Sequence, residues 1–596
     1  MTDQTQLPGK DSPLEHTLEK AKNTLSTLGI EVQETSYLNP VPHCWSVHLQ
    51  ETSCSALYTN GKGTSKLASM ASGIGEFIER LATDFFFSEY YITSGVHSKK
   101  QYPFIFFPDE QWFSFSDETS SPDKDLENEI GSTLLSPELL NFYNPDGELT
   151  CADLTDNNCD DSNKGICALP FIQVTEGSVC YFPISLLNNL YVSNGMAAGN
   201  SPSECKSQAL SEIIERYVKN IVIAKGLSLP IVPDASLAAF PHLLTIRDTL
   251  IDNGFSVTIH DSSLGGQFPV ICVLLVDTEN GGAYAAFGAN CRFETAVERT
   301  LTELLQGREL NQLHNFSFPV HNIAMVADQY NLESHFIDSD GLLAWSMFKD
   351  AADFSFSPWS FNGSTAEEEK ELHKRISSCG HSIYLREYLH CGLYSCRIIV
   401  PGMSEIYPVD DLIWNNRNKG SKLRPQILNL PTMSSSQLAG MIELLDELEL
   451  DDQLLLSHVI GILFDQDSNW KTLRIGELKA HIYLAMNDYD SAIEWCDWAV
   501  LYGDVSKDRA NIFRAVSTLL QFTQGSKNMD DYSNGVLRCI PEADLQIAKD
   551  VIGGQEMFLG LNFCPSWEEI SSEHQKLTQL YDNLRSSKSK FSGNIE

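Results

Sequence analysis

The sequence lacks the features that mark exported and membrane-spanning proteins. No basic segment followed by an apolar run opens the chain, and no stretch approaches the roughly 20 apolar residues that a membrane-spanning helix needs. Basic residues are also few: 41 lysines and arginines stand against 80 acidic residues, for a formal charge of −39. Such a surface repels the phosphates of nucleic acids and anionic lipids. We therefore expect a cytoplasmic protein that binds neither nucleic acid nor membrane directly.

Two familiar sites for nucleotides and metals are also missing. The stretch Gly61–Ser65 looks like part of a phosphate-binding P-loop, but an earlier glycine is missing and Gly63 stands where a hydroxyl must hold magnesium. The 15 cysteines form no Cys-x-x-Cys pair, and some lie in apolar stretches such as Val270–Leu274. We therefore expect a reducing compartment, and we expect no P-loop, zinc site or iron–sulfur cluster.

The length and the pattern of apolar residues predict a mixed core. The chain has 596 residues, which is too long for one ordinary domain, and 42% apolar with 20% charged residues is typical of folded proteins. Between residues 61 and 431, predicted buried strands such as Phe268–Val276 and Ser395–Val400 alternate with helical patterns such as Glu294–Leu310. This alternation predicts an α/β or α+β core in which β-sheet packs against helices, and we take α+β as the fold class. Residues 1–60 are expected to pack on that core as an N-terminal segment.

Two polar or proline-rich stretches divide the chain further. Asp117–Lys164 is rich in Asp, Asn, Ser and Pro, which predicts a long surface excursion between core elements. Pro401–Pro431 is a connector, after which residues 436–596 show almost no strand signals. Within them, Leu478–Ala485 and Tyr489–Trp495 predict a helix, a tight turn and a second helix, similar to one tetratricopeptide unit. Such helices present a docking surface for another protein, or they form an ordinary helical bundle.

The most informative segment is a predicted helix with three polar residues on one face. Within Ala71–Leu81, the side chains of Ser72, Glu76 and Glu79 fall at i, i+4 and i+7. The other positions are mostly apolar or small and continue into Phe85–Phe87, so the helix is expected to be largely buried. Buried carboxylates require compensation by cations or hydrogen bonds.

The same pattern recurs on a second predicted helix. Glu204, Gln208, Glu212 and Glu215 are spaced at i, i+4, i+8 and i+11, and Arg216 follows them. Both helices contain the string Glu-x-Ile-Glu-Arg, and each follows a glycine-containing turn that opens with Asn-Gly. Such turns allow close approach of the backbone to a ligand. The two segments therefore look like a diverged internal repeat.

A third predicted helix adds Arg299 and Glu303, one turn apart. Several glutamates with little access to water repel one another unless cations lie among them, and oxygen ligands select hard ions such as magnesium or calcium. Magnesium in turn implies a phosphate ligand. The alternative is that the glutamates form buried salt bridges with Arg80, Arg216 and Arg299. Spacing alone does not decide between the two, but the repetition of a whole local pattern favours a shared ligand.

Three further segments carry a resemblance to a known family. They are Pro8–Asp11, Leu38–Pro42 and Tyr191–Met196. With them and the glutamate helices, the chain resembles the YcaO family from about residue 60 to residue 431. Within that family it is most similar to the long bacterial members described as accessory factors for a ribosomal-protein methylthiotransferase. The resemblance implies a YcaO ATP-binding domain over residues 61–431 and a helical, tetratricopeptide-like domain over residues 436–596.

The resemblance also implies the cofactors ATP and Mg2+ and assigns residues to them. No catalytic residue is assigned, since positioning and electrostatics suffice for phosphoryl transfer. The implied ATP-binding residues are Lys10, Ser72, Glu76, Asn200, Glu204, Glu212, Arg216 and Arg299, and the implied metal ligands are Glu76, Glu79, Glu204, Glu212, Glu215 and Glu303.

The family resemblance implies two activities and leaves a third possibility open. The first is an ATP- and magnesium-dependent accessory role in β-methylthiolation of a small-subunit ribosomal protein, through ATP hydrolysis or phosphorylation of a backbone amide. The second is a peptide-modifying enzyme that forms azolines or thioamides. Azoline formation fits less well because the segment Lys588–Glu596 lacks the proline-rich tail of azoline-forming members. Ala197 stands where the accessory factors have a polar residue, which removes one possible hydroxyl contact and should leave binding intact. The third is a scaffold without catalysis. The expected partners are ATP, a methylthiotransferase and a second copy of the chain.

Overall fold

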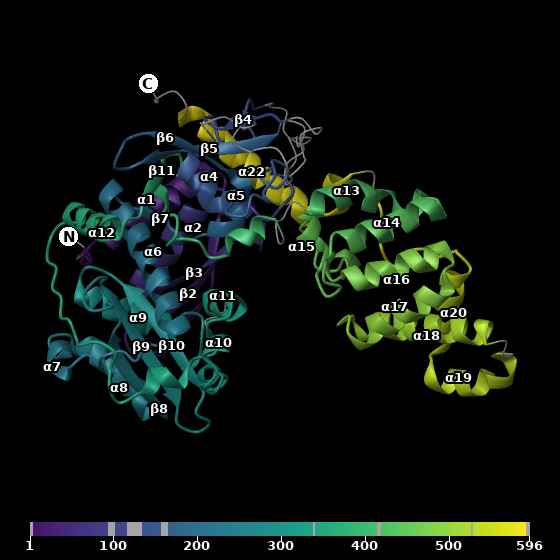
Figure 1. Ribbon diagram of the computed structural model, residues 1–596. Helices are drawn as coiled ribbons and strands as arrows, with labels where there is room; N and C mark the ends of the chain where they lie inside the picture. The colour runs from purple at the N-terminus through teal and green to yellow at the C-terminus, as the bar shows by residue number, and fades with distance from the viewer. Residues whose placement is uncertain are drawn as a thin grey trace.

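The computed structural model describes residues 4–92, 102–115, 134–156, 165–337, 340–413, 419–525, 529–564 and 566–591. Figure 1 shows a core of sheets and helices on one side and a mostly helical C-terminal part that extends away from it. The predicted α+β core and the helical C-terminal part are therefore confirmed. No helix among these residues combines the length and the apolar character that a membrane crossing requires.

The first sheet supports the first glutamate helix. Its three antiparallel strands follow the order β1-β2-β3. A Cβ added to Gly61 on β3 would overlap the carbonyl of Ser69 and the amide of Gly73 on α2, so the strand lies directly against that helix. The elements are α1 (Leu14–Thr27), β1 (Val32–Val41), β2 (Cys44–Glu51), β3 (Tyr58–Gly63) and α2 (Lys66–Ala82).

The second sheet has six strands and supports the second glutamate helix, α6. Its antiparallel order is β4-β5-β11-β12-β7, with β6 paired to β5, and α6 packs against β7 and β12. The predicted strand Ser395–Val400 is present as β12. The elements are β4 (Gln111–Phe113), β5 (Ile166–Gln173), β6 (Val179–Pro183), β7 (Met196–Gly199), α6 (Pro202–Lys225), β11 (Tyr384–Tyr388) and β12 (Tyr394–Ile399).

The third sheet, in the order β10-β9-β8, supports the third glutamate helix, α9. The predicted strand Phe268–Val276 is present as β9. The predicted helix Glu294–Leu310 is shorter in the structure, where α9 ends at Glu303. Gly307, four residues later, has a positive φ of 71°, which is not a right-handed helical conformation. The elements are α7 (Asp234–Leu237), α8 (Pro241–Asp252), β8 (Phe255–Asp261), β9 (Val270–Asp277), β10 (Ala283–Ala289), α9 (Phe293–Glu303), α10 (Ile323–Val326), α11 (Gln329–Ile337) and α12 (Thr365–Ser378).

The predicted surface excursion Asp117–Lys164 is wrong for its described part, residues 134–156. This part forms the helix α4 (Pro137–Tyr143) and buries Leu139 and Leu154 in the core. Apolar residues spaced among the polar ones provide this buried face, and the polar composition concealed it. The remainder of the predicted excursion lies outside the described residues.

The C-terminal part is helical, and its last helix returns to the core. The predicted helix–turn–helix is present as α16 and α17, with Asn487 in the left-handed region between them. Figure 1 shows α22 running back from the helical part onto the core, where Leu577, Tyr581 and Leu584 join the core cluster of α2. The helices are α13 (Lys419–Asn429), α14 (Ser435–Glu447), α15 (Leu456–Ile460), α16 (Ile475–Met486), α17 (Tyr489–Leu501), α18 (Lys507–Gln524), α19 (Ser533–Cys539), α20 (Glu542–Ile552), α21 (Trp567–Ile570) and α22 (Ser572–Phe591).

Candidate functional site

The first glutamate helix begins at a well-formed cap. Ser65 accepts a hydrogen bond from the Ala68 amide, which starts α2 and sets the direction of its polar face. In the second half of the helix, Glu76 Oε1 accepts from Arg80 Nε at 3.2 Å and from Arg80 Nη2 at 2.8 Å. The Arg80 guanidinium also lies over the Phe85 ring, 4.6 Å from its centroid. Glu76 and Arg80 are therefore held as a fixed pair.

The second glutamate helix reproduces this arrangement. Ser201 caps α6 by accepting from the Glu204 amide. Glu212 Oε1 accepts from Arg216 Nε at 3.1 Å and from Arg216 Nη2 at 2.9 Å, and Arg216 lies 4.4 Å from the centroid of the Phe336 ring. The sequence repeat thus has a repeated local geometry, in which each arginine joins a glutamate one turn earlier to an aromatic ring.

The third helix brings a lysine from the first sheet into the site. Glu303, at the end of α9, forms an ion pair with Lys62 of β3. Arg299 Nη1 donates to Gln208 Oε1 of α6 at 2.7 Å, and Arg299 Nε is buried without a hydrogen-bond partner among the described residues. Glu215 of α6 accepts from the amide of Ala289, which ends β10. Side chains of α6 and α9 therefore meet beside β3.

The glutamates of α2 and α6 also act on one another electrostatically. The Glu79 side chain makes no hydrogen bond or ion pair with any described residue. Burial, the Glu212 carboxylate and, more weakly, Glu76 raise the pKa of Glu79 well above its usual value. Burial lowers the pKa of Lys62 to about 8, helped by Arg299 and opposed by the neighbouring glutamates. We call this group the carboxylate cluster: Glu76, Glu79, Glu212, Glu215 and Glu303, with the cations Lys62, Arg80, Arg216 and Arg299.

Three of the residues assigned to ATP form a separate group near the N-terminus. Glu204 is buried and accepts from the Asp11 amide at 2.8 Å and from Asn200 Nδ2, and it lies 3.3 Å from Lys10 Nζ. Glu204 precedes Glu212 by eight residues on α6, which is about 12 Å along the helix. One metal ion cannot contact both residues in this arrangement, but a ligand that extends along α6 can.

The Ser72 side chain, like that of Glu79, makes no hydrogen bond with a described residue. It lies on α2 one turn before Glu76, and its side chain is exposed. Its hydroxyl is therefore free to contact a ligand that lies along this face of α2.

The carboxylate cluster fits magnesium and phosphate by its chemistry. No three carboxylate, histidine or cysteine side chains in the described ranges are arranged to hold a metal ion as they stand. Glu76, Glu212 and Glu303 instead face Arg80, Arg216 and Lys62, so the salt bridges considered from the sequence are partly realised. The unpaired, charge-repelled carboxylate of Glu79 supplies an oxygen ligand that a hard cation prefers. The unpaired Nε of Arg299 is suited to a phosphate oxygen.

Lys62 is the residue that the sequence interpretation missed. The lysine was considered only as part of a failed P-loop, yet it pairs with Glu303 inside the cluster. The available signal was its position between two glycines, since Gly61 and Gly63 both pack closely against α2. Because the partner lies some 240 residues later in the chain, no local pattern could have identified it.

The comparisons with known proteins cover nearly the whole chain. Residues 60–404 match the YcaO cyclodehydratase family, described as ATP- and Mg2+-binding, and residues 420–590 match the YcaO cyclodehydratase C-terminal domain. This match confirms the predicted family and the predicted cofactors.

Two relatives align along their full length. The ribosomal protein S12 methylthiotransferase accessory factor YcaO of Escherichia coli (strain K12) is 40% identical over 593 residues, 99% of each chain. An uncharacterized protein of Haemophilus influenzae (strain ATCC 51907 / DSM 11121 / KW20 / Rd) is 37% identical over 594 residues, again 99% of each chain.

Solved structures of lower identity are also similar. A heterocyclase in complex with substrate and cofactor has a TM-score of 0.43 at 16% identity, with 69% of this chain and 57% of that chain covered. A YcaO protein from Methanopyrus kandleri bound with AMPPCP and Mg2+ has a TM-score of 0.40 at 17% identity, with 68% and 96% covered.

Proposed function

The chain belongs to the YcaO family, and from this premise we propose that it is an ATP- and magnesium-dependent accessory factor for methylthiolation of a ribosomal protein. The proposal takes the role from the relative that is 40% identical over 99% of both chains. It takes the chemistry from the family, in which ATP hydrolysis or amide phosphorylation would be the step that uses the nucleotide.

The observation that carries the proposal is the state of Glu79 within the carboxylate cluster. Its carboxylate lies close enough to Glu212 and Glu76 for both to raise its pKa, while Arg80 and Arg216 lower it only in part. In a scaffold without a ligand this repulsion only destabilises the fold, and replacing Glu79 by an uncharged residue would remove it. A site for a divalent cation brings carboxylates together in this way, because the charge of the bound ion offsets their repulsion.

The residues divide into metal-holding and nucleotide-holding groups. When bound, magnesium neutralises the phosphate charge and so supports phosphoryl transfer. Glutamates on the three helices would hold the metal, and basic and amide side chains would hold the phosphates and the rest of the nucleotide. The proposed metal ligands are Glu76, Glu79, Glu204, Glu212, Glu215 and Glu303, and the proposed nucleotide contacts are Lys10, Ser72, Asn200, Arg216 and Arg299.

Arg80 and Arg216 position two of the glutamates in this proposal. Each is anchored over an aromatic ring and holds a glutamate one turn earlier. They therefore keep Glu76 and Glu212 in fixed positions before any ligand arrives. Carboxylates that are already held in place lose less conformational entropy when a ligand binds.

The experiment that tests the site is calorimetric binding of ATP with and without magnesium to the full chain. We expect magnesium-dependent binding that weakens at least about tenfold in Glu79→Gln and in Glu215→Gln. The matched control is Glu19→Gln, which removes one charge from the exposed face of α1 and is expected to bind like the native chain. Absence of ATP binding by the native chain would leave a scaffold role.

A second experiment tests the accessory role. The native chain is added to a ribosomal-protein methylthiotransferase and its substrate protein, with ATP or with a non-hydrolysable analogue. We expect ATP to increase the yield of methylthiolated protein in a mass spectrum, and Glu79→Gln to remove that increase. If the chain instead removes water from a peptide or adds sulfur to it directly, the chain is a peptide-modifying enzyme and not an accessory factor.

The proposal extends to two protein partners. A methylthiotransferase is the partner that the name of the 40% identical relative suggests, and the helical part beyond the core is the surface we assign to it. A second copy of the chain is the other. Light scattering of the purified protein tests the dimer, and pull-down with a deletion of α16 to α20 tests the helical surface.

A further inference from the structure

The helix α11, which lies beside the candidate site, has an outer side with exposed apolar residues. On α11, Tyr330, Glu333 and Ile337 fall at i, i+3 and i+7, so they share one side of the helix. Tyr330 is 78% exposed and Ile337 is 61% exposed. Figure 1 shows α10 and α11 next to each other on one side of the core. This side of α11 is not covered by any described part of the chain.

The apolar character extends to the segments next to α11. Met325 of α10 is 50% exposed, and the exposed rings of Phe318 and Trp345 contact each other with their centroids 5.4 Å apart. Asn331, on the inner side of α11, donates to the Val326 carbonyl of α10 at 2.8 Å, which fixes the two helices to each other. Single exposed apolar residues are common on protein surfaces, but a group of them is typical of an interaction site.

The same side of α11 is acidic. Between residues 309 and 348 the sequence contains no lysine or arginine. Glu333 accepts from Gln329 Nε2 and Asp328 accepts from a backbone amide of α11, and neither carboxylate forms an ion pair with a described residue. Burial and the carboxylates of Asp411 and Asp328 raise the pKa of Glu333 above its usual value, opposed by Gln329. The surface therefore combines apolar side chains with negative charge.

The inner side of α11 contacts the candidate site. Lys219 of α6 lies one turn after Glu215, and its Nζ donates to the His335 carbonyl of α11 at 2.5 Å. The ring of Phe336 is the one over which Arg216 lies. A partner on the outer side of α11 would therefore be about one helix diameter, roughly 10 Å, from the carboxylate cluster.

We propose that this surface binds a basic protein segment in which lysines or arginines are interspersed with apolar side chains. We call it the α11 face and define it as Met325, Asp328, Tyr330, Glu333 and Ile337. Charge complementarity favours this occupant, because its cations would pair with the two carboxylates while its apolar side chains cover the exposed ones.

A second copy of the chain fits the α11 face less well. Each copy carries a formal charge of −39, and a symmetric contact would place the same carboxylates opposite one another. The inference also goes beyond the proposed function, because docking of a partner on the α11 face does not require ATP.

The test uses the full chain and three fluorescent peptides of equal length. The first contains lysine, glycine and leucine, the second has glutamate in place of lysine, and the third has serine in place of leucine. Binding is measured by fluorescence anisotropy without ATP, at physiological ionic strength. We expect the first peptide to bind at least about tenfold more tightly than either of the others. When it is bound, hydrogen exchange of the α11 amides should slow at least about fivefold.

Variants of the α11 face locate the binding. Tyr330→Ser combined with Ile337→Ser should weaken binding of the first peptide at least about tenfold, because the apolar contacts are lost. Glu333→Gln should weaken it about threefold, as expected for a partly exposed ion pair. These residues are at the surface, so the variants are expected to keep the fold.

Controls separate this inference from non-specific binding and from the proposed function. Leu501→Ser combined with Tyr502→Ser changes two side chains of the helical part that are 70% and 62% exposed, and Glu19→Gln removes a charge from α1. Both controls should bind the first peptide like the native chain. Tyr330→Ser combined with Ile337→Ser should still bind ATP with magnesium in the calorimetric assay. If the native chain binds the peptide at α11 but does not bind ATP, the proposed function fails and the α11 face remains.

Three results would overturn the inference. Equal binding of the first and third peptides would mean that the apolar side chains contribute nothing. Native-like binding by Tyr330→Ser combined with Ile337→Ser would place the peptide elsewhere on the acidic surface. The third is a native dimer that becomes a monomer in this double variant, measured by light scattering, which would assign the α11 face to a contact between two copies.

Discussion

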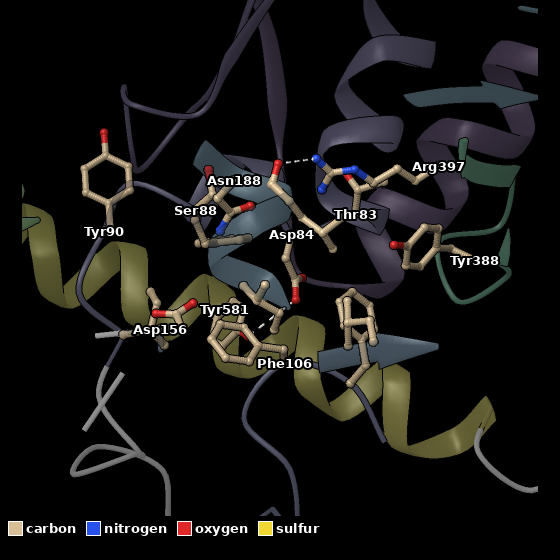
Figure 2. Close-up of a pocket in the computed structure, with 16 residues that line it drawn as sticks. Thr83, Asp84, Ser88, Tyr90, Phe106, Asp156, Asn188, Tyr388, Arg397 and Tyr581 are labelled. Atoms are coloured by element: carbon tan, nitrogen blue, oxygen red, sulfur yellow. Dashed lines mark hydrogen bonds between the residues drawn. The ribbon is translucent and has the colours of Figure 1, made fainter. Parts of the chain in front are cut away.

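Lys588, near the end of α22, donates its ammonium protons to both carboxylate oxygens of Asp84, the second residue after α2. Both side chains are largely buried, and Lys588 also donates to the carbonyl of Phe106. The last helix of the chain is thereby attached to the end of the helix that carries Glu76 and Glu79. Figure 2 shows the Asp84 carboxylate pointing toward Tyr581 of α22. The buried ion pair of Lys588 and Asp84 links the C-terminal part to the helix that carries part of the candidate site.

Removing the lysine is expected to detach α22. Lys588→Met leaves Asp84, whose pKa burial already raises and Lys588 lowers, without its cation. We expect the opening free energy of α22 to fall by about 3 kcal/mol, as measured by native-state hydrogen exchange. Adding Asp84→Asn should recover much of the loss. Lys590→Met, an exposed site on the same helix, is the control and should change little.

Replacing two glycines near the site by alanine should change the free energy of unfolding in opposite directions. Gly61→Ala would place a methyl group against the Ser69 carbonyl and the Gly73 amide, so we expect a loss of about 2 kcal/mol or more in the free energy of unfolding. Gly75→Ala, inside α2, meets no atom within 4 Å and should stabilise the chain by about 0.5 to 1 kcal/mol. Urea denaturation of both variants checks the pair. A stabilised Gly61→Ala protein would contradict the close packing of β3 on α2.

Lys62 is expected to compete with magnesium for Glu303. Its ammonium neutralises that carboxylate when no metal is bound. Lys62→Met should therefore strengthen binding of magnesium in the absence of nucleotide by roughly fivefold, which corresponds to a partly exposed ion pair. Lys66→Met removes the same charge from an exposed residue that lies over the Tyr37 ring, and it should leave magnesium binding unchanged. Weaker magnesium binding in Lys62→Met would show that the lysine supports the site in another way.

The attachment of α22 is expected to weaken in acid through His574. The buried ring accepts from the Leu463 amide at 3.2 Å and donates to the Tyr91 carbonyl at 2.9 Å. Burial lowers the pKa of His574 from 6.5 to about 4. Because the pKa is lowered, the neutral ring stabilises the folded state at pH values above 6.5, the pKa of the unfolded chain. This stability is lost as the pH falls toward 4.

The size of this effect can be measured at two pH values. At pH 5 the linkage amounts to about 2 kcal/mol. Hydrogen exchange of α22 at pH 7 and pH 5, in the native chain and in His574→Gln, should show a smaller pH dependence in the variant. His16→Gln, at an exposed position of α1, is the control. An equal pH dependence in all three proteins would exclude His574 as the cause.

Local patterns in the sequence were sufficient for the glutamate helices and for the two named strands, β9 and β12. The i, i+4 and i+7 spacing in α2 and the repeat in α6 predicted a polar face on each helix, because a helix places such residues on one side whatever its surroundings. The apolar run of β9 and the mostly apolar segment of β12 predicted buried strands, because short apolar segments of this length are typical of strands in a core. The early end of α9 and the buried part of residues 134–156 were not predicted, since both depend on packing partners.

The sequence by itself determined which side chains share a helical face and, through its resemblance, the family and its cofactors. The tertiary structure alone decided that Lys62 faces Glu303, that Glu204 lies apart from Glu212, and that Lys588 reaches Asp84. These relationships join residues far apart in the chain, and their geometry depends on how sheets and helices pack. The spacing of residues within one helix follows from the regular geometry of that helix. The distance between two elements depends instead on every side chain that packs between them.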